Sequence, residues 1–410
     1  MGISVMKFGG TSVGSIERIK QVAKRVIQKI NDNERVVVVV SAMGHTTDEL
    51  MDLACQASEQ PSKRELDMLL STGEQQTIAL LAMVLNDQGT PAESFTGWQA
   101  GILTEHIHGN ARIDTIDTDR LKTCIYDGKV AIVAGFQGLT ENGEITTLGR
   151  GGSDTTAVAL AAALQADICE IYTDVDGVYT TDPRYVDMAQ KIDALGYDEM
   201  LEMAYLGASV LHPRAVEYAK KFNMPLVVRS SFSHAPGTII REDKHVEKGQ
   251  NVRGLAFDRD VVKVSVLGLP NEVTMLSKVF QSLAEAAINV DIIIQNVLNE
   301  AETSVSFTIS NAELGEALNV LKSDQKVLGF REAVTERGLA KVSIIGSGMA
   351  SNPGVAATMF SALARSGIMV KMVSTSEIKV STVIPIEHLE NALHVLHQTY
   401  KLDAKTVQAY

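Results

Sequence analysis

The sequence predicts an α/β protein in which a mostly parallel sheet, sandwiched by helices, precedes two ferredoxin-like βαββαβ units. Apolar runs of strand length alternate with helical periods from residue 3 to about residue 230, as expected for parallel strands joined by crossover helices. A β-branched run at 36–40 shows no polar alternation, which is typical of a strand buried on both faces. Beyond residue 258 the chain repeats itself.

The first elements of the predicted sheet are a strand at 5–8 and the helix that follows it. Ser15 is placed to cap this helix. One face of the helix carries apolar residues at helical spacing, namely Ile16, Ile19, Ala23, Val26, Ile27 and Ile30. Further strands are expected at 130–133 and 168–172.

A long helix should begin at the capping box of Ser62 and Glu65. It carries the apolar positions Leu66, Leu69, Leu70, Thr77, Leu80 and Leu81. Gly73 and Glu74 fall inside it. A glycine inside a helix costs about 1 kcal/mol relative to alanine, so Gly73 indicates close approach of a ligand or of backbone. An exposed position on the helix is the alternative for Glu74.

The C-terminal third contains an internal repeat. Lys-Val-Ser-Val-Leu-Gly at 263–268 recurs as Lys-Val-Ser-Ile-Ile-Gly at 341–346. Each copy is expected to fold as strand, helix, strand, strand, helix, strand. The preceding segment, 233–258, holds a Pro-Gly pair and a charged stretch, which predict a linker. The expected domains are therefore 1–232, the linker at 233–258, a first repeat unit at 259–335 and a second at 336–410.

Composition and charge exclude several classes of protein. A net charge of −13 repels phosphate backbones, so neither nucleic acid nor an anionic membrane is expected as a partner. No apolar run approaches the roughly 20 residues that a membrane span needs. Three cysteines without CxxC spacing and a start that shows no secretion signal indicate a cytoplasmic protein. His106 and His108 lack a third ligand, so no metal site is expected.

Two glycine-rich turns are the strongest candidates for binding anions. Lys7-Phe8-Gly9-Gly10-Thr11-Ser12 lies where the first strand ends and a helix follows. Paired glycines let the backbone approach a polyphosphate there, and Lys7 adds a positive charge. An ordinary tight turn is the alternative there. Gly149-Arg150-Gly151-Gly152-Ser153-Asp154 precedes an apolar helix, with Ser153 placed as its N-cap. Arg150 can bind a carboxylate through two hydrogen bonds, which favours function over a merely flexible loop.

Polar residues after two further strands complete the candidate site. Ser41 and Thr47 follow the 36–40 strand, and ligands of open α/β sheets gather at such carboxyl ends. Thr173 and Asp174 follow the 168–172 strand. The segment continues to Asp182-Pro183-Arg184, and Tyr179 and Arg184 are expected near the base or phosphates of a nucleotide. A solvent-exposed acidic turn is the alternative for this segment.

Together and in this order, these stretches resemble the amino-acid kinase family, and within it the aspartokinases. The segments 7–13, 148–154 and 172–177 are similar to signatures of that family, and the tandem repeat is similar to its paired ACT regulatory domains. The resemblance covers nearly the whole chain. It implies transfer of phosphate from ATP to the side-chain carboxylate of L-aspartate. The product is 4-phospho-L-aspartate, in the first step of lysine, threonine and methionine biosynthesis.

The resemblance also implies a role for each candidate residue. Lys7 and Asp154 would be catalytic, with Asp154 orienting Lys7, and Mg²⁺ would be held mainly by ATP. The ATP contacts would be Lys7, Phe8, Gly9, Gly10, Thr173, Asp174, Tyr179, Asp182 and Arg184. The aspartate contacts would be Ser41, Thr47, Glu74, Arg150 and Ser153, with Arg150 on the α-carboxylate and Glu74 on the ammonium. Ser209 stands where many relatives carry a lysine that would contact the nucleotide.

ACT domains bind amino acids at interfaces between copies, so the resemblance implies feedback by lysine, alone or with threonine, and a homo-oligomer formed through these domains. The candidate effector contacts are Asn271, Thr274, Asn289, Asp291 and Gln295, for which loop and sheet-edge polarity is the alternative. Two other functions remain open. One is a non-catalytic amino-acid sensor with this fold. The other is a kinase of a different acid such as glutamate, because one methylene is worth only about 1–3 kcal/mol in a pocket.

Overall fold

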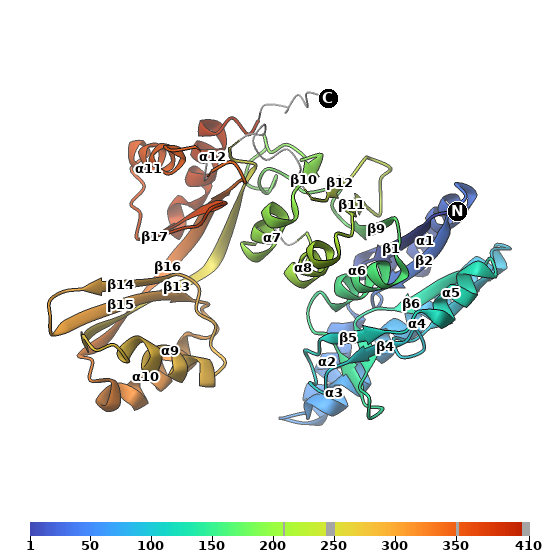
Figure 1. Ribbon diagram of the computed structural model, residues 1–410, viewed down its shortest axis with the longest axis horizontal. Coiled ribbons are helices and arrows are strands. Elements are labelled where there is room, and N and C mark those ends of the chain that lie inside the picture. The colour runs from blue at the N-terminus through green and yellow to red at the C-terminus, as the bar shows by residue number, and fades with distance from the viewer. Residues whose placement is uncertain (208–209, 243–250, 350–351, 404–410) are drawn as a thin grey trace. The chain divides into compact units, whose positions relative to one another are not determined.

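The computed structural model describes residues 1–207, 210–242, 251–349 and 352–403, and the chain divides into two compact units. The N-terminal unit comprises Met1–Val178 and Lys191–Lys244. The C-terminal unit comprises Tyr179–Gln190 and His245–Tyr410. Each unit has its own sheets, helices and core (Figure 1).

The N-terminal unit is built on an eight-stranded sheet that is mostly parallel, as predicted. In spatial order its strands are β10 (Ala194–Leu195), β12 (Thr238–Ile240), β11 (Leu226–Ser230), β9 (Ile168–Thr173), β1 (Ile3–Phe8), β2 (Arg35–Val40), β6 (Val130–Ala134) and β3 (Ala92–Phe95). Only β11 and β12 run antiparallel to each other. The other neighbours are parallel, so the carboxyl ends of β1, β2, β6 and β9 meet at one edge.

Helices and a second, smaller sheet surround these strands. The helical segments are η1 (Gly10–Val13), α1 (Ile16–Asn31), α2 (Thr46–Ala57), α3 (Lys63–Leu70), α4 (Thr72–Asp87), α5 (Asp119–Tyr126), α6 (Gly152–Leu164), α7 (Tyr197–Tyr205) and α8 (Pro213–Phe222). The smaller sheet, which the sequence did not predict, has the order β5 (Ile113–Ile116), β4 (Ile102–Thr104), β7 (Gln137–Leu139) and β8 (Ile145–Thr147).

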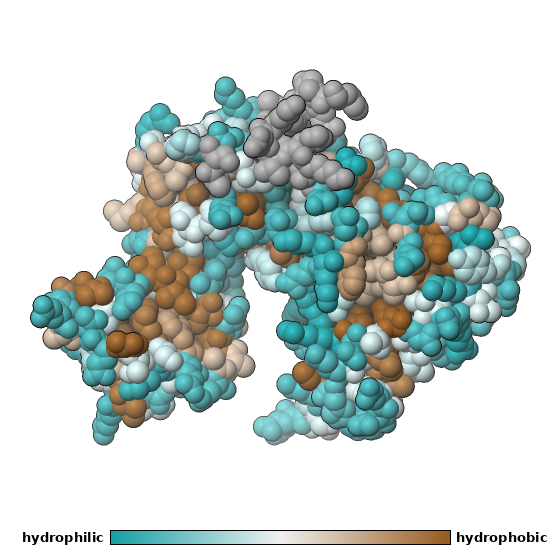
Figure 2. Space-filling model, viewed as in Figure 1, coloured by the Kyte–Doolittle hydropathy of each residue, from teal (hydrophilic) through white to brown (hydrophobic). Residues whose placement is uncertain are grey.

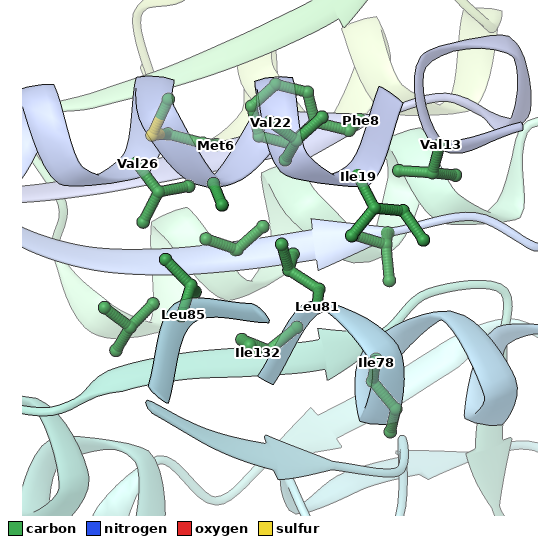
Figure 3. Close-up of a cluster of buried hydrophobic side chains, with 14 of the residues drawn as sticks. Met6, Phe8, Val13, Ile19, Val22, Val26, Ile78, Leu81, Leu85 and Ile132 are labelled. Carbon is green, nitrogen blue, oxygen red and sulfur yellow. The ribbon is translucent and has the colours of Figure 1, made fainter. Parts of the chain in front are cut away.

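The core of this unit forms between α1, α4 and the sheet face to which Met6 and Phe8 of β1 point (Figure 3). Leu81 and Leu85 of α4 are fully buried in it. Burying one such leucine contributes roughly 1.5–3 kcal/mol, so the packing holds β1 firmly. Because side chains alternate along a strand, Lys7 points to the opposite face.

The helix caps predicted at Ser15 and Ser62 are present, but the long helix that follows Ser62 is divided. Ser15 accepts a hydrogen bond from the Arg18 N–H at 3.3 Å, and Ser62 accepts one from the Glu65 N–H at 3.4 Å. The helix that begins at Ser62 ends at Ser71, which separates α3 from α4. The expected long helix is therefore present over 63–87 but divided at Ser71, whose φ of −60° and ψ of −18° stay in the right-handed helical region.

Taken together, α3 and α4 form an apolar stretch, Lys63–Asp87, that is long enough to cross a membrane by length and composition alone. Half of its most apolar window is buried inside the protein, and the stretch is broken at Ser71. Both features are typical of helices that pack in a protein core, and Leu81 and Leu85 lie in the core described above.

The C-terminal unit is a six-stranded antiparallel sheet with helices. In spatial order its strands are β14 (Ile293–Val297), β15 (Glu302–Ile309), β13 (Gly254–Pro270), β16 (Glu332–Ile345), β18 (Lys379–Pro385) and β17 (Met372–Thr375). Its helical segments are α9 (Met275–Glu285), α10 (Leu314–Leu328), α11 (Val355–Arg365), η3 (Ile386–His388) and α12 (Leu389–Thr399). α9 and α10 close one core, around Leu283 and Leu321, and α11 and α12 close another, around Leu363 and Leu393.

The two βαββαβ units share their longest strands. β13 pairs with β16 along two stretches: 261–267 against 332–339, and 254–258 against 341–345. The second unit therefore takes its fourth strand from residues that precede the first unit in the chain. The first unit is inserted within the second, whereas the sequence predicted two consecutive units at 259–335 and 336–410.

The predicted linker at 233–258 is corrected at both of its ends. β12 belongs to the main sheet, where it pairs with β10 and β11. Residues 254–258 form the beginning of β13. These strands are short or lie beside a charged stretch, so they produce no periodic signal in the sequence. Residues 243–250 lie outside the described part of the chain.

Candidate active site

A single cavity of about 750 Å³ in the N-terminal unit brings together residues that are far apart in the sequence. All seven residues predicted for catalysis or aspartate binding line it, namely Lys7, Ser41, Thr47, Glu74, Arg150, Ser153 and Asp154. They come from the carboxyl ends of β1 and β2 and from the beginnings of α2, α4 and α6. Lys7 and Arg150 thus share one cavity, which is the geometric condition for bringing a nucleotide and a carboxylate together.

Lys7 is held in place by an acidic partner. Its Nζ lies 2.6 Å from Oδ1 of Asp154 in the first turn of α6, and Lys7 is 8% exposed. A Cβ added at Gly9 would lie 3.4 Å from the same Nζ, an ordinary van der Waals contact, so the turn after β1 lies directly beside the ammonium group. The pair fixes the direction of the lysine while leaving its remaining N–H donors for a ligand.

Glu74 is a buried carboxylate with one oxygen unused. It lies in the first turn of α4, and its Oε1 accepts the Ala42 N–H at 3.0 Å. Its Oε2 is buried without a hydrogen-bond partner among the described residues. Burial raises the pKa of Glu74 to about 7, although the Ala42 N–H opposes the rise. A buried oxygen without a hydrogen bond costs folding free energy, and a donor group on a bound ligand would remove that cost.

Gly73 permits this arrangement through a close approach of backbone. A Cβ added at Gly73 would lie 2.8 Å from Cβ of Ala42, which real Cβ atoms essentially never reach. Gly73 therefore lets α4 approach the segment after β2, which puts Glu74 within reach of the Ala42 N–H. The prediction of a close approach at Gly73 is confirmed, although the glycine lies at the start of a helix and not inside one.

The loop before α6 depends on two left-handed glycines. Gly149 has φ +76° and Gly151 has φ +66°, values that favour glycine. Gly151 is also the N-cap of α6, so the expectation that Ser153 caps this helix was wrong. Arg150 between the glycines is exposed and forms no ion pair with a described residue. Its guanidinium is therefore available to an anion in the cavity.

A buried network on the cavity wall, centred on Asp67, was not among the predicted features. Asp67 of α3 is fully buried. Its carboxylate accepts hydrogen bonds from His108 Nδ1 at 2.9 Å, from the Gly109 N–H at 3.0 Å and from Thr147 Oγ1 at 2.5 Å. The network ties α3 to β8 and to the loop before β5, so His108 has a structural role. An acid between Leu66 and Leu70, on the apolar face of the expected helix, was the available signal.

Five of the residues predicted to contact ATP lie at the neighbouring carboxyl ends of β1 and β9 but are not among the described residues that line the cavity. They are Phe8, Gly9, Gly10, Thr173 and Asp174. Phe8 stacks on Tyr172 with ring centroids 4.7 Å apart, so its side chain belongs to the core and only its backbone can face a ligand. A Cβ at Gly10 would lie 2.9 Å from the Ala42 carbonyl oxygen, so the turn requires glycine.

Three residues predicted to contact ATP belong to the C-terminal unit: Tyr179, Asp182 and Arg184. Their segment, Tyr179–Gln190, packs there through both backbone and side chains. The Leu255 N–H donates to the Thr180 carbonyl at 2.6 Å, and Val186 is 2% exposed in the core that α11 and α12 close. The five-residue nucleotide edge expected from the sequence is thus divided between the two units and stays a prediction. Ser209 lies outside the described residues.

The predicted effector residues all lie in the first βαββαβ unit: Asn271, Thr274, Asn289, Asp291 and Gln295. Some already have partners within the chain. Asp291 pairs with Lys341 of β16, and Gln295 Nε2 donates to Thr303 Oγ1 at 3.3 Å. The first of these contacts joins the first unit to a strand of the second.

No group of three or more His, Cys, Asp or Glu side chains among the described residues is arranged to hold a metal ion. Two carboxylates on the cavity wall already have partners. Asp154 is paired with Lys7, and Asp67 accepts the three hydrogen bonds given above.

Comparison with known proteins identifies the family. The amino acid kinase family model matches residues 2–230, and an ACT domain model matches 264–325 and 342–400. The chain is 58% identical over 409 residues to an aspartokinase from Bacillus sp. (strain MGA3), covering 100% of both chains. It resembles solved structures of E. coli aspartokinase III. The complex with aspartate and ADP has 30% identity and a TM-score of 0.80, covering 97% of this chain and 99% of that one. The complex with lysine and aspartate has 29% identity and a TM-score of 0.78, with the same coverage. The chain therefore belongs to the amino-acid kinase family, and within it to the aspartokinases.

Proposed function

We propose that this chain transfers the γ-phosphoryl group of ATP to the side-chain carboxylate of L-aspartate. A new bond forms between a carboxylate oxygen and the γ-phosphorus, the bond from that phosphorus to the β–γ bridging oxygen breaks, and ADP leaves. The observation that carries the proposal is the shared cavity, in which the fixed Lys7–Asp154 pair, the free Arg150 and the half-satisfied Glu74 meet. The E. coli relative of similar fold was solved with aspartate and ADP.

Substrate positioning follows from the charges in the cavity. Arg150 would bind the α-carboxylate of aspartate through two hydrogen bonds, and the unused Oε2 of Glu74 would accept one from the ammonium group. The hydroxyl groups of Ser41, Thr47 and Ser153 would supply uncharged hydrogen bonds to the substrate. An aspartate side-chain carboxyl ordinarily has a pKa of roughly 4, so it is ionised at neutral pH and needs no catalytic base.

Catalysis would consist of positioning and charge neutralisation. Lys7, aimed by Asp154, would interact with the transferred phosphoryl group as negative charge builds on its oxygens. The backbone N–H groups of the turn after β1 would add donors. A magnesium ion arriving with ATP would neutralise phosphate charge. The chain's own residues then have only to align the two anions.

An ADP-release assay tests this proposal. With saturating ATP and Mg²⁺, L-aspartate should support turnover and L-glutamate should support much less. When Arg150 binds the α-carboxylate of glutamate, the side-chain carboxylate lies one methylene further away than that of aspartate and is misplaced for phosphoryl transfer. Arg150→Gln should raise the KM for aspartate by roughly tenfold or more, the loss expected for a charge-assisted hydrogen bond. Arg64→Gln, on an arginine that pairs with Glu65 and Glu144 and does not line the cavity, is the matched control. Absence of turnover with aspartate would end the proposal.

We also propose that lysine, alone or with threonine, inhibits the enzyme through the C-terminal unit, and that the reaction opens the biosynthesis of lysine, threonine and methionine in the cytoplasm. Two observations support the regulation. The C-terminal unit contains the paired ACT domains, and the E. coli relative was solved with lysine bound. β14 is an edge strand on which Ile293 and Val297 are exposed, and Figure 2 shows hydrophobic residues gathered over this part of the unit. This edge suits a homo-oligomer formed through the ACT domains.

The Tyr179–Gln190 segment offers a route from effector to nucleotide. It carries residues predicted to contact ATP, yet it packs in the C-terminal unit, where Tyr185 meets Phe257 edge-on at 4.8 Å. An effector that shifts this unit would therefore shift the segment.

Val186→Ala should weaken inhibition by lysine more than it changes uninhibited turnover. Deleting 255–410 should also abolish inhibition by lysine. Because that deletion removes the packing partners of the segment, the point variant is the cleaner test. Full lysine inhibition in Val186→Ala would contradict the route.

A further inference from the structure

A second cavity, of about 340 Å³, lies on the other face of the main sheet from the active-site cavity. Lys7 points into the active-site cavity, whereas Phe8, the next residue of β1, points to the α1 side and stacks on Tyr172. The guanidinium carbon of Arg25 lies 5.3 Å from the centre of the Tyr172 ring. Arg25 lines the second cavity, which is formed between α1 and the residues that follow β11.

One face of α1 gives this cavity a basic wall. Arg18, Gln21, Arg25 and Gln28 are spaced by three, four and three residues, which puts them on one side of a helix, and all four line the cavity. Lys24 adds a third positive charge. This wall holds donors in both charged and amide form, the set that binds anionic oxygens.

The two guanidinium groups are held in position before any ligand arrives. Arg18 Nη1 donates to the Thr11 carbonyl at 2.6 Å, and its guanidinium carbon lies 5.3 Å from the centre of the Phe232 ring. Arg25 Nη2 donates to the Ser233 carbonyl at 2.6 Å. Neither arginine forms an ion pair with a described residue, so each keeps its charge and further N–H donors for another partner. Such preorganisation lowers the entropic cost of binding.

The charge around this cavity is not balanced by nearby acids. No Asp or Glu is among the described residues that line it, although the whole chain carries a net charge of −13. A buried acid on this face, Glu170, is already occupied: its Oε1 lies 3.5 Å from Lys29 Nζ and 3.3 Å from Arg229 Nε. The opposite wall carries Phe232 beside a polar pair, Ser12 and Ser231, which share a buried hydrogen bond of 2.5 Å.

We propose that this cavity is a second anion-binding site, separate from the active site, for a small ligand that carries two linked anionic groups, with diphosphate as the simplest example. Arg18 and Arg25 are seven residues apart, and at about 1.5 Å per residue their Cα atoms are separated by about 10 Å along α1. If the two arginine side chains converge from this separation, each guanidinium can bind its own anionic group of one ligand. The serine hydroxyls supply neutral hydrogen bonds to the same ligand.

Calorimetric titration of the full chain with pyrophosphate tests the site. The Arg18→Gln, Arg25→Gln double variant should bind pyrophosphate at least about tenfold more weakly in this site, as expected when charge-assisted hydrogen bonds are lost. Lys20→Gln removes one charge from the same helix outside the cavity and is the matched control, with affinity unchanged. Pyrophosphate binding in the active site is common to all variants, and ADP release with aspartate should stay within about twofold of wild type, because no altered residue lines the active-site cavity.

Four outcomes would overturn the proposal. The first is equal pyrophosphate binding by wild type and the double variant. The second is equal weakening in Lys20→Gln, which would indicate diffuse attraction to the helix. The third is inorganic phosphate binding as tightly as pyrophosphate, which would exclude a ligand with two groups. Arg25→Lys keeps the positive charge but loses the planar set of guanidinium N–H donors. It should fold as wild type by circular dichroism and still weaken pyrophosphate binding. The fourth contradicting outcome is unchanged pyrophosphate affinity in this variant.

Discussion

Replacing Glu74 by glutamine should stabilise the free protein at alkaline pH while weakening the binding of aspartate. Glu74 is 3% exposed, its Oε1 accepts the Ala42 N–H, and its Oε2 has no partner among the described residues. Glutamine keeps the shape of the side chain and the acceptor for Ala42 but removes the charge. The substitution therefore isolates the cost of holding an unpaired carboxylate in the free protein.

The size of the effect follows from the pKa of Glu74, which burial raises from 4.5 to about 7. Between these two pH values the folded state binds more protons than the unfolded state, so wild-type stability falls as the pH rises. The difference of about 2.5 pKa units (7 minus 4.5) corresponds to about 3 kcal/mol once the pH exceeds 7. Glu74→Gln does not titrate, so relative to wild type it should gain up to about 3 kcal/mol at pH 8 and almost nothing at pH 4.5.

Urea unfolding of both proteins at pH 5 and pH 8 measures this gain, and the kinetics measure its functional counterpart. Loss of a charge-assisted hydrogen bond to the ammonium group should lower kcat/KM for aspartate by roughly 10- to 150-fold. Wild-type kcat/KM should rise with pH through about 7 as Glu74 ionises, and the variant should lack this rise. Glu65→Gln, on the exposed side of α3, is the control. A variant less stable than wild type at pH 8, or with unchanged aspartate kinetics, would refute the reasoning.

Three further predictions concern catalysis and folding. Lys7→Ala should lower kcat by about 100-fold or more while the KM for aspartate changes little, because its charge acts on the phosphoryl group; steady-state kinetics check this, and an unchanged kcat would contradict it. Gly151→Ala should destabilise the N-terminal unit, since φ is +66° and the new Cβ would lie 2.1 Å from Cγ of His212; a thermal midpoint equal to that of wild type would be inconsistent. Leu81→Ala should cost roughly 2–5 kcal/mol through the cavity left in the core, measured by urea unfolding, whereas a loss below about 1 kcal/mol would mean that the core rearranges to fill the space.

Most of the candidate active site could be predicted because its residues carry local signals. Lys7 lies at the carboxyl end of a strand, Ser41 and Thr47 come shortly after the next one, and Arg150 and Asp154 flank the start of an apolar helix. Such positions are recognisable one segment at a time. What those signals do not contain is the environment of each side chain. The raised pKa of Glu74 arises from burial by segments that are distant in sequence, and only the folded chain creates it.

The sequence by itself determined the α/β class, the mostly parallel sheet, the duplicated C-terminal units and the seven catalytic and aspartate-binding candidates that line one cavity. Each of these follows from periodicity, glycine placement or repetition within a short stretch of chain. Only the tertiary structure decided which distant segments of the chain pair and pack with one another. Residues 254–258 complete the second βαββαβ unit, and Tyr179–Gln190 packs in the C-terminal unit although it lies within the predicted domain 1–232. Strand pairing and core packing between distant segments depend on surfaces that exist only after each unit has formed, so no local pattern encodes them.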